Sequence, residues 1–244
     1  MKKYIFFLLS VSLFCPSMKA QKQSYIGINF GVGTHWPAAD LASRFGSNQS
    51  LGLGVDWITN KNFIWGIQSN YYYSKNVKEK VLQNLYTKEG YLLGKDLTPA
   101  NILTRERGFD IMFNIGKLWV QKSAKNTSGI RTTLGIGFLQ HKIRIQDDSR
   151  TVTQLSGEYI KGYDRLTNGL AITQFIGYQH ISQNKRLNFF GGFEFTEAFT
   201  KSRRAWNWDT NTADTKKRLD ILYGARIGWI LPLSINSKSE EYSY

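Results

Sequence analysis

Apolar and polar residues alternate along eight segments of this chain, at the spacing of β-strands. Residues two apart point to the same side of a strand, so each segment has one apolar face and one small or polar face. The first shows the pattern: Ile26, Ile28, Phe30 and Val32 alternate with Asn29 and three glycines. Only the sixth is irregular, because Gln174 falls in phase with its apolar residues. The segments span residues 25–34, 51–57, 63–73, 109–116, 130–138, 170–178, 188–199 and 219–229.

A β-sandwich also alternates, so the lengths of the connections carry more information. They are alternately long and short from the first to the last. Outer-membrane barrels have long external loops and tight periplasmic turns. The sequence therefore predicts an eight-stranded antiparallel up-and-down transmembrane β-barrel, with connections at residues 35–49, 59–62, 75–105, 120–128, 146–165, 182–186 and 201–217.

Tryptophan placement supports this topology, because barrels carry aromatic girdles where acyl chains meet headgroups. Trp57, Trp65, Trp119 and Trp229 all fall at the periplasmic end of their strands and form the expected membrane-interface girdle. A second aromatic belt is expected at the outer end, from Tyr71, Tyr73, Phe109 and Phe199. The alternative is that these are ordinary core aromatics, which need not cluster at one level.

The N-terminus resembles an export signal, with Lys2 and Lys3 before an apolar run that is too short to span a bilayer as a helix. Cleavage after Ala20 would remove Cys15, the only cysteine, and leave no disulfide or thiolate metal site. A lipoprotein is disfavoured because Phe14 and Pro16 flank that cysteine. We expect a signal peptide at 1–20, a barrel at 21–233 and a polar periplasmic tail at 234–244.

The predicted mature chain is basic. Removing residues 1–20 takes away three lysines and leaves 29 basic against 18 acidic residues, a net charge of +11. Such an excess favours anionic partners. An exported chain rarely meets nucleic acid, so outer-membrane lipid and lipopolysaccharide are the expected partners.

The signal, the cysteine-free mature chain, the eight-strand meander and the C-terminal run 218–233 resemble the small outer-membrane β-barrel proteins of Bacteroidota, broadly the PorT-like group. The resemblance covers nearly the whole mature chain and implies residence in the bacterial outer membrane. It further implies a role as an accessory component of an envelope complex, because some members of the group act in type IX secretion and gliding motility. One departure is that the last strand stops near Leu233, before a polar tail.

The polar faces of the strands point into a barrel that is too narrow for an open water channel. Opposite charges in such a lumen should pair, which favours a structural network over a proton or ion pathway. The residues expected there are Asp56, Asp110, Arg131, Glu194, Asp220 and Arg226.

Catalytic, cofactor and metal sites are not expected. His35, His141 and His180 are scattered over opposite ends of the barrel, and no G-x-S-x-G motif is present. A lipid hydrolase built on His141 near Ser156 or Asp147 is a minor alternative.

Two external loops could bind partners. Residues 75–105 make a connection of about 30 residues, a length that is commonly functional. Its Val77, Val81, Leu82 and Leu85 suggest a short amphipathic helix that either docks a partner or closes the barrel mouth. In the last loop, a basic cluster around Trp206 and Trp208 suits lipopolysaccharide phosphates. The alternative is that this loop is simply solvated. The cluster consists of Lys201, Arg203, Arg204, Lys216, Lys217 and Arg218.

The sequence thus favours a non-enzymatic accessory or structural protein with an envelope protein partner. A small transport or ligand-binding barrel is the alternative, and a lipid-modifying enzyme is a third.

Overall fold

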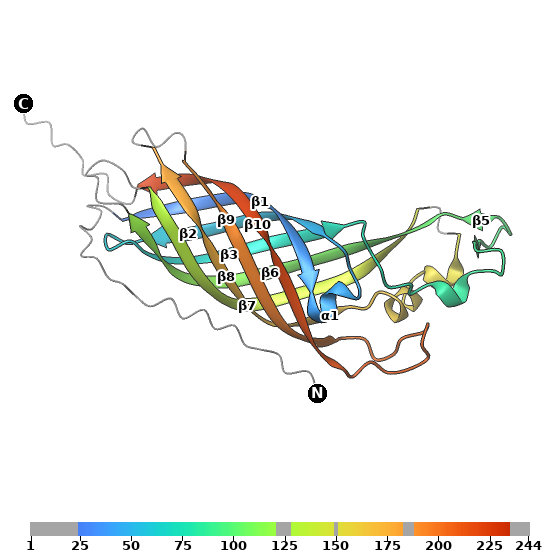
Figure 1. Cartoon of the computed structure of the whole chain (residues 1–244). Coiled ribbons are helices and arrows are strands. Elements are labelled where there is room, and N and C mark those ends of the chain that lie inside the picture. Colours follow the sequence, from blue (N-terminus) through green and yellow to red (C-terminus); the bar gives the residue numbers. More distant parts are fainter. Residues whose placement is uncertain (1–23, 121–127, 149–150, 183–187, 235–244) are drawn as a thin grey trace, which may run out of the picture.

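A computed structural model describes residues 24–120, 128–148, 151–182 and 188–234 of the 244-residue chain. Within them, eight long strands close into one antiparallel barrel with the order β1-β10-β9-β8-β7-β6-β3-β2 (Figure 1). The barrel strands are β1 (Tyr25–Ala38), β2 (Asn48–Ile58), β3 (Phe63–Ser74), β6 (Ile102–Val120), β7 (Gly129–Asp147), β8 (Thr167–Ile181), β9 (Asn188–Ser202) and β10 (Lys217–Ser234). The predicted fold class is confirmed.

The remaining elements are short and lie in the long loops. They are α1 (Ala39–Ala42), the 3-10 turns η1 (Gln83–Leu85), η2 (Thr153–Leu155) and η3 (Tyr159–Gly162), and the two-residue strands β4 (Leu92–Leu93) and β5 (Pro99–Ala100). None of the helices in the described part of the chain is long and apolar enough to cross a membrane. The amphipathic helix predicted from Val77 to Leu85 is wrong: the segment contains only η1, and β4 pairs with β5 in a small hairpin.

Closure depends on β1, which pairs with both ends of the sheet. Tyr25 lies opposite Ile58 of β2 and opposite Ser234 of β10. All neighbours along the barrel are antiparallel, so the strands hydrogen-bond to each other around the whole circumference and no edge is left. Only a closed barrel or a helix can satisfy its backbone in this way inside hydrocarbon.

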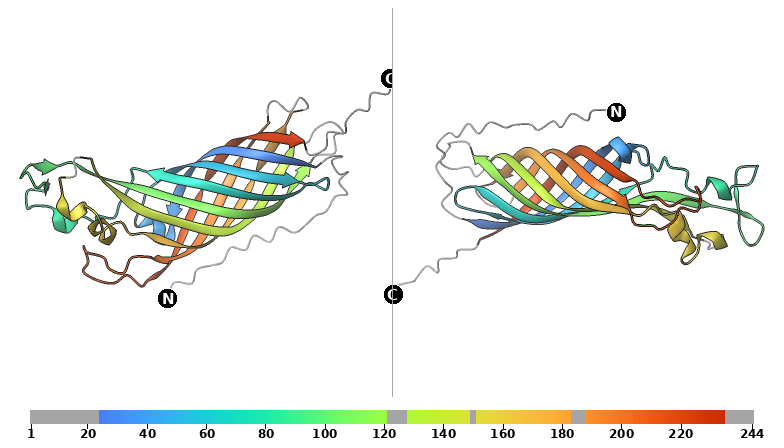
Figure 2. Two further views of the ribbon diagram at one scale, coloured as in Figure 1. Left: turned by 180° about the vertical axis from the view of Figure 1, so that it is seen from behind. Right: turned by 90° about the horizontal axis from the view of Figure 1, so that it is seen from below.

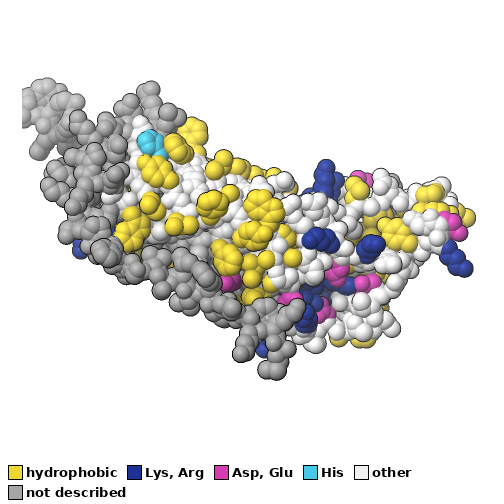
Figure 3. Space-filling view, in the orientation of Figure 1, with side chains coloured by type: hydrophobic (Ala, Val, Ile, Leu, Met, Phe, Trp, Pro, Cys, Tyr) yellow, Lys and Arg dark blue, Asp and Glu magenta, His cyan; other side chains and the backbone are white. Residues whose placement is uncertain are grey.

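The outer wall is apolar over most of the barrel. Phe30, Leu53, Ile67 and Ile136 are each 53 to 58% exposed, and the space-filling view shows hydrophobic side chains over the wall with charged ones gathered toward the loop end (Figure 3). A monomer in water rarely exposes such a surface, whereas a bilayer solvates it. The chain is therefore a transmembrane β-barrel.

Several strands are longer than a membrane crossing requires, and β6 and β7 are the longest. β6 and β7 have 19 residues each, which is roughly 60 Å at about 3.3 Å per residue, whereas the apolar band of such barrels is about 25 Å tall. Their outer ends project beyond the other strands and carry β4 and β5 at the tip (Figures 1 and 2). Residues 102–105, which the sequence analysis placed in a loop, are thus strand.

The lumen is filled from end to end. An apolar plug of Tyr25, Ile58, Ile64, Leu118 and Ile181 closes the periplasmic end. Glycines on the inner face leave room for large side chains: a Cβ at Gly66 would lie 2.1 Å from Asp56 Oδ1, and one at Gly228 would lie 2.6 Å from the ring of Phe190. Small residues thus allow charges and aromatics to fill the interior.

We expect Ile67→Arg to destabilise the barrel by about 2–4 kcal/mol, because it places a charge in hydrocarbon between the two aromatic belts, whereas Ile130→Arg near the periplasmic interface should cost about 0–1 kcal/mol. Unfolding by denaturant in phospholipid vesicles, followed by tryptophan fluorescence, gives both values. Equal costs at the two positions would contradict the placement of the bilayer.

Candidate functional site

The periplasmic half of the lumen holds a hydrogen-bonded chain of five side chains. Asp56 Oδ2 accepts from Arg131 Nη2 at 2.5 Å and from Asn29 Nδ2 at 2.5 Å. Arg131 also donates to Gln179, which in turn donates to the hydroxyl of Tyr25. Arg131 and Asp56 are each 2% exposed, so the pair is held away from water and its charges attract each other strongly.

A second arginine sits in an aromatic clamp at the middle of the lumen. The guanidinium carbon of Arg226 lies 5.0 Å from the ring centre of Phe175 and 5.4 Å from that of Phe190. Its Nη1 is 2.9 Å from Glu194 Oε2, and His35 Nε2 is 3.4 Å from the other oxygen. Cation–π contacts and the carboxylate together compensate the burial of this charge.

The other two acids that the sequence predicts in the lumen face neutral groups or a histidine. Asp110 accepts hydrogen bonds from Tyr72 at 2.5 Å and from Asn70 at 3.0 and 3.1 Å. Asp220 Oδ2 lies 2.9 Å from His141 Nε2 and accepts from Thr200 at 2.5 Å. The structure buries all six residues expected in the lumen. Both arginines face an acid, Arg131 with Asp56 and Arg226 with Glu194, whereas Asp110 and Asp220 face no arginine.

Sequence reasoning missed most of the partners of these acids. Asn29, Asn70, Tyr72 and Thr200 all lie on inward faces, and alternation alone could have placed them in the lumen. Which of them meets which acid depends on the register between adjacent strands, which alternation alone does not give.

The histidines do not gather into a catalytic site. His141 is 3% exposed, and its ring contacts Phe45 edge to face at 5.6 Å. Ser156 donates instead to the Thr153 carbonyl, and Asp147 accepts from the Val152 amide. His35 lies in the lumen, and His180 is hydrogen-bonded to Ser128 near the periplasmic end. The structure thus does not bring His141 to Ser156 or Asp147, and it shows no metal-binding group of His, Cys, Asp and Glu in the described part of the chain.

The girdle tryptophans lie at the periplasmic end of the wall. Trp57 and Trp65 are opposite each other in β2 and β3 and, with Trp229, are 45 to 55% exposed. Trp119 is half-buried, and its indole donates to Thr132. Aromatic rings exposed at one level of the wall are what a membrane-interface girdle requires, and the girdle itself stays a prediction.

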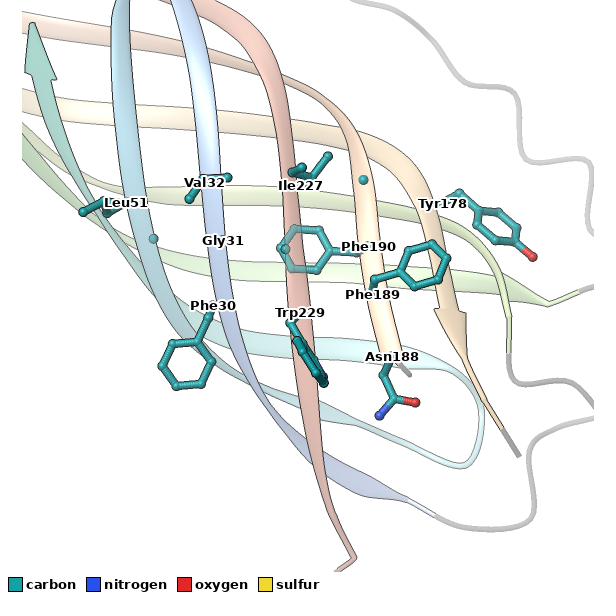
Figure 4. A pocket seen from close by; sticks show the side chains of 13 residues that line it. Phe30, Gly31, Val32, Leu51, Tyr178, Asn188, Phe189, Phe190, Ile227 and Trp229 are labelled. Atoms are coloured by element: carbon teal, nitrogen blue, oxygen red, sulfur yellow. The ribbon is translucent and has the colours of Figure 1, made fainter. Parts of the chain in front are cut away.

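An apolar hollow of about 920 Å³ lies on the wall at this level (Figure 4). Phe30, Trp229 and Ile227 border it, and Gly31 and Gly228 keep the wall thin there. It is on the surface that faces acyl chains, so lipid is its natural filling.

At the opposite end, the external loops pack into one body, which we call the loop cap: residues 39–47, 75–101, 151–166 and 203–216. Its core is apolar and continues into the outer end of the barrel. Phe45 and Leu41 are fully buried there together with Tyr72, Val81, Leu82, Leu92, Met112, Leu139, Ile143, Ile145, Val152, Leu155, Tyr163, Ala171, Ala198 and Leu222. Such burial supplies the main stabilisation of loops that carry little regular structure.

Ion pairs then join the loops across the cap. Arg165 bonds to both Glu79 and Asp209, so it links three loops at once. Arg44 lies 3.4 Å from Glu79 and 3.8 Å from Asp214. Both arginines are at most 5% exposed, and burial of paired charges makes each pair stronger than an exposed surface pair.

Two charged groups of the cap, Arg44 and Asp214, have shifted pKa values. Burial lowers the pKa of Arg44, and the nearby Arg218 lowers it further, although an arginine stays protonated in a protein. Burial would raise the pKa of Asp214, but the hydrogen bond and charge of Arg218 outweigh burial and lower it. A carboxyl whose pKa is lowered by folding stabilises the fold above its unfolded pKa and loses that contribution only as the pH falls through the folded value.

The tip of the β6–β7 projection exposes large apolar side chains. We call residues 86–99 the tip. Leu97 is 80% exposed, and Tyr86, Tyr91 and Leu93 are 37 to 45% exposed. The tip is anchored on one side, because the Lys95 amide donates to the Thr151 carbonyl at 2.8 Å. A held segment that still exposes several apolar groups is typical of an interaction surface.

The six basic residues predicted to contact lipopolysaccharide fall into two groups. Arg204 pairs with Asp164, Arg218 with Asp214 at 2.6 Å, and Lys216 with Asp40 at 3.2 Å. The others have no acidic partner among the described residues: Lys201, Lys217 and Arg203. Charges on the chain itself thus satisfy half of the predicted cluster.

Comparisons with known proteins give a general likeness in fold. No family model matches the chain, and no curated protein matches it. Among solved structures it is similar to Ail, the attachment invasion locus protein of Yersinia pestis, with 9% identity over 85% of this chain and 99% of that chain and a TM-score of 0.41.

Two further solved structures are similar. A major outer membrane protein from Thermus thermophilus has 9% identity, covers 85% of this chain and 98% of its own, and gives a TM-score of 0.45. OprG from Pseudomonas aeruginosa has 12% identity, covers 87% and 98%, and gives a TM-score of 0.38. None of these findings supports the narrower PorT-like resemblance, which stays a prediction.

The location of the protein follows from its own architecture. An even number of antiparallel strands, short turns at one end, long loops at the other and an apolar wall with an aromatic girdle define the bacterial outer-membrane barrel. The chain has each of these features, and it is a protein of the bacterial outer membrane. The predicted signal peptide and polar tail lie outside the described residues, apart from Ser234.

Breaking the buried pair in the inner lumen should be costly. Asp56→Asn or Arg131→Met alone should destabilise the barrel by about 3–5 kcal/mol, because each leaves a buried group without its partner, and the double variant should cost much less than the sum. Denaturant unfolding in vesicles measures the cycle. Lys161→Met, which removes one half of an exposed pair with Glu158, is the control and should change little. Additive losses would show that the two charges do not interact.

Removing the arginine that links three loops should loosen the cap without unfolding the barrel. Arg165→Met deletes the bonds to Glu79 and Asp209, so external protease should cut the loop at residues 75–101 about tenfold faster. Peptide mapping by mass spectrometry locates the cuts, and heat-modifiable migration on gels reports the intact barrel. Unchanged cleavage would mean that apolar packing alone holds the cap.

Proposed function

We propose that this barrel is a non-enzymatic interaction protein that presents its loop cap and tip to a protein partner, as an accessory or structural component of an envelope complex. One observation supports the proposal most directly. Four loops with few regular elements are tied by buried ion pairs and a shared apolar core into a single platform, and the part of it farthest from the membrane exposes Tyr91, Leu93 and Leu97.

The filled lumen argues against a channel. Each segment of it contains buried side chains, from the apolar plug through the clamped Arg226 to the cap core under Phe45. A solute would have to displace ion pairs and aromatic rings to pass. A transport role for the lumen therefore has little structural support.

The chemistry of the tip indicates the kind of partner. The charges of the tip cancel, with Lys88 and Lys95 against Glu89 and Asp96, so its attraction for a partner is mainly apolar. Aromatic and leucine side chains are typical centres of protein interfaces. A protein with a complementary apolar patch fits this surface better than a polysaccharide or a small ion. The narrower assignment to type IX secretion or gliding motility has only the sequence resemblance in its support.

A ligand-binding barrel is the second candidate. A polar hollow of about 430 Å³ lies between the loops and is lined by Asp40, Arg44, Glu79, Arg165 and Asp214, among others. Paired charges of both signs would suit a small polar molecule. Its lining residues already satisfy one another, which makes this candidate the weaker one.

The test is a mild-detergent pull-down of the tagged protein from isolated outer membranes, with quantitative mass spectrometry. Wild type should recover a stoichiometric partner, and Leu93→Ser/Leu97→Ser should recover about tenfold less, because interface centres dominate binding energy. Tyr159→Ser is the matched control, since it removes a residue that is 62% exposed elsewhere on the cap. Recovery of the barrel without a partner would overturn the proposal. An equal loss of partner from Tyr159→Ser would show that the tip is not the binding surface.

A further inference from the structure

One stretch of the outer wall changes from apolar to basic within two residues. In register across β8, β9 and β10, Asn168 lies opposite Lys201, which lies opposite Lys217. Two residues toward the membrane, Leu170, Phe199 and Leu219 form the next row on the same face. The boundary between hydrocarbon and headgroup therefore runs between these two rows.

The two lysines form an unusual pair. Residues directly opposite in antiparallel strands have Cβ atoms about 5 Å apart, and like charges there are destabilising. The other cations nearby have acidic partners: Arg204 has Asp164, Lys216 has Asp40 and Arg218 has Asp214. Lys201 and Lys217 have none among the described residues, so the repulsion between them is not offset by the chain.

A third cation completes the group. Arg203 follows β9, and its Nε donates to the side-chain oxygen of Asn168. That bond orients the guanidinium toward the same row and leaves its other N–H groups for a ligand. The fork of an arginine beside two ammonium groups is well suited to a phosphate.

These residues border a hollow of about 810 Å³, together with Leu170, Phe199 and Leu219. Asp40 also lines it, but both its oxygens are engaged, one by Lys216 and one by the amide of Leu219. Glu197 follows on the same strand face, two residues below Phe199, and is not part of the lining. The hollow is therefore basic at its outer rim and apolar at its membrane side.

We propose that Lys201, Lys217 and Arg203 bind the phosphate of an outer-leaflet glycolipid, whose acyl chain lies on Leu170, Phe199 and Leu219. The ligand is an amphiphile because the site has both a basic rim and an apolar row. An anion alone would leave the apolar row without contact, and a neutral lipid would leave the lysines unpaired. The phosphate would neutralise the pair and turn a local repulsion into an attraction. This inference does not depend on the protein partner proposed above.

The test uses the full-length protein in detergent with lipid A of defined structure, and native mass spectrometry to measure binding. Lys201→Gln/Lys217→Gln should weaken the binding of bis-phosphorylated lipid A at least about tenfold. Lys78→Gln/Lys161→Gln removes the same charge from loop lysines that have their own partners and should change it less than about twofold. Equal loss in the two double variants would overturn the site, because net charge alone would then explain binding.

The source of the phosphate is tested separately. Dephosphorylated lipid A should bind wild type as weakly as the phosphorylated form binds Lys201→Gln/Lys217→Gln. Inorganic phosphate should not compete at millimolar concentration, because it cannot use the apolar row. Full competition by inorganic phosphate would overturn the lipid assignment in favour of a free anion site.

Stability gives a readout that does not depend on detecting the complex. Without lipid A, Lys217→Gln should be at least as stable to heat as wild type, because it removes the like-charge contact. With bis-phosphorylated lipid A, wild type should gain more stability than the variant, so the order reverses. Heat-modifiable migration on gels follows both and confirms that the variant folds. A variant that is less stable without lipid and gains as much from it would contradict the proposal.

Discussion

A peptide group inside hydrocarbon finds no water to bond, and this constraint governs the whole molecule. It requires β1 to pair with both β2 and β10, because any free edge would leave a row of donors and acceptors unsatisfied. Closure with eight strands then fixes a narrow interior. A narrow interior leaves little space beside the inward side chains, so the residues of the lumen must fit one another in charge, size and shape.

The chain meets that demand by layering. Aliphatic groups close the periplasmic end, arginines paired with acids and aromatic rings occupy the centre, and an apolar core continues from the outer lumen into the loops. Because the core of the cap is continuous with the core of the barrel, the loops do not sit on top of a finished structure. They complete it, and this is why segments with few helices or strands still hold a fixed arrangement.

The sequence predicts the wall better than the interior. Period-two alternation identifies lipid-facing residues such as Ile67 and Phe113 because hydrocarbon imposes the same rule on every strand, and loop lengths give the orientation. Alternation also places Asp110 and Asp220 in the lumen. It cannot predict that Tyr72 and Thr200 meet them, because such contacts depend on the register between adjacent strands. The helix expected at Val77 to Leu85 does not form, because the apolar residues there pack into the core of the cap. Residues 102–105 were expected in a loop because they extend β6 beyond the membrane, where lipid no longer enforces alternation.

The linkage of the loops by Arg165, Glu79 and Asp209 also determines which residues an antibody against the outer face would contact together. Arg165 is 86 positions from Glu79 and 44 positions from Asp209 in the chain. The outer face therefore brings together residues that are far apart in the sequence. An antibody against the joined loops would contact residues from several of them, so a linear peptide copied from one loop carries only part of that contact. Raising antibodies to the joined loops therefore requires the folded barrel as immunogen.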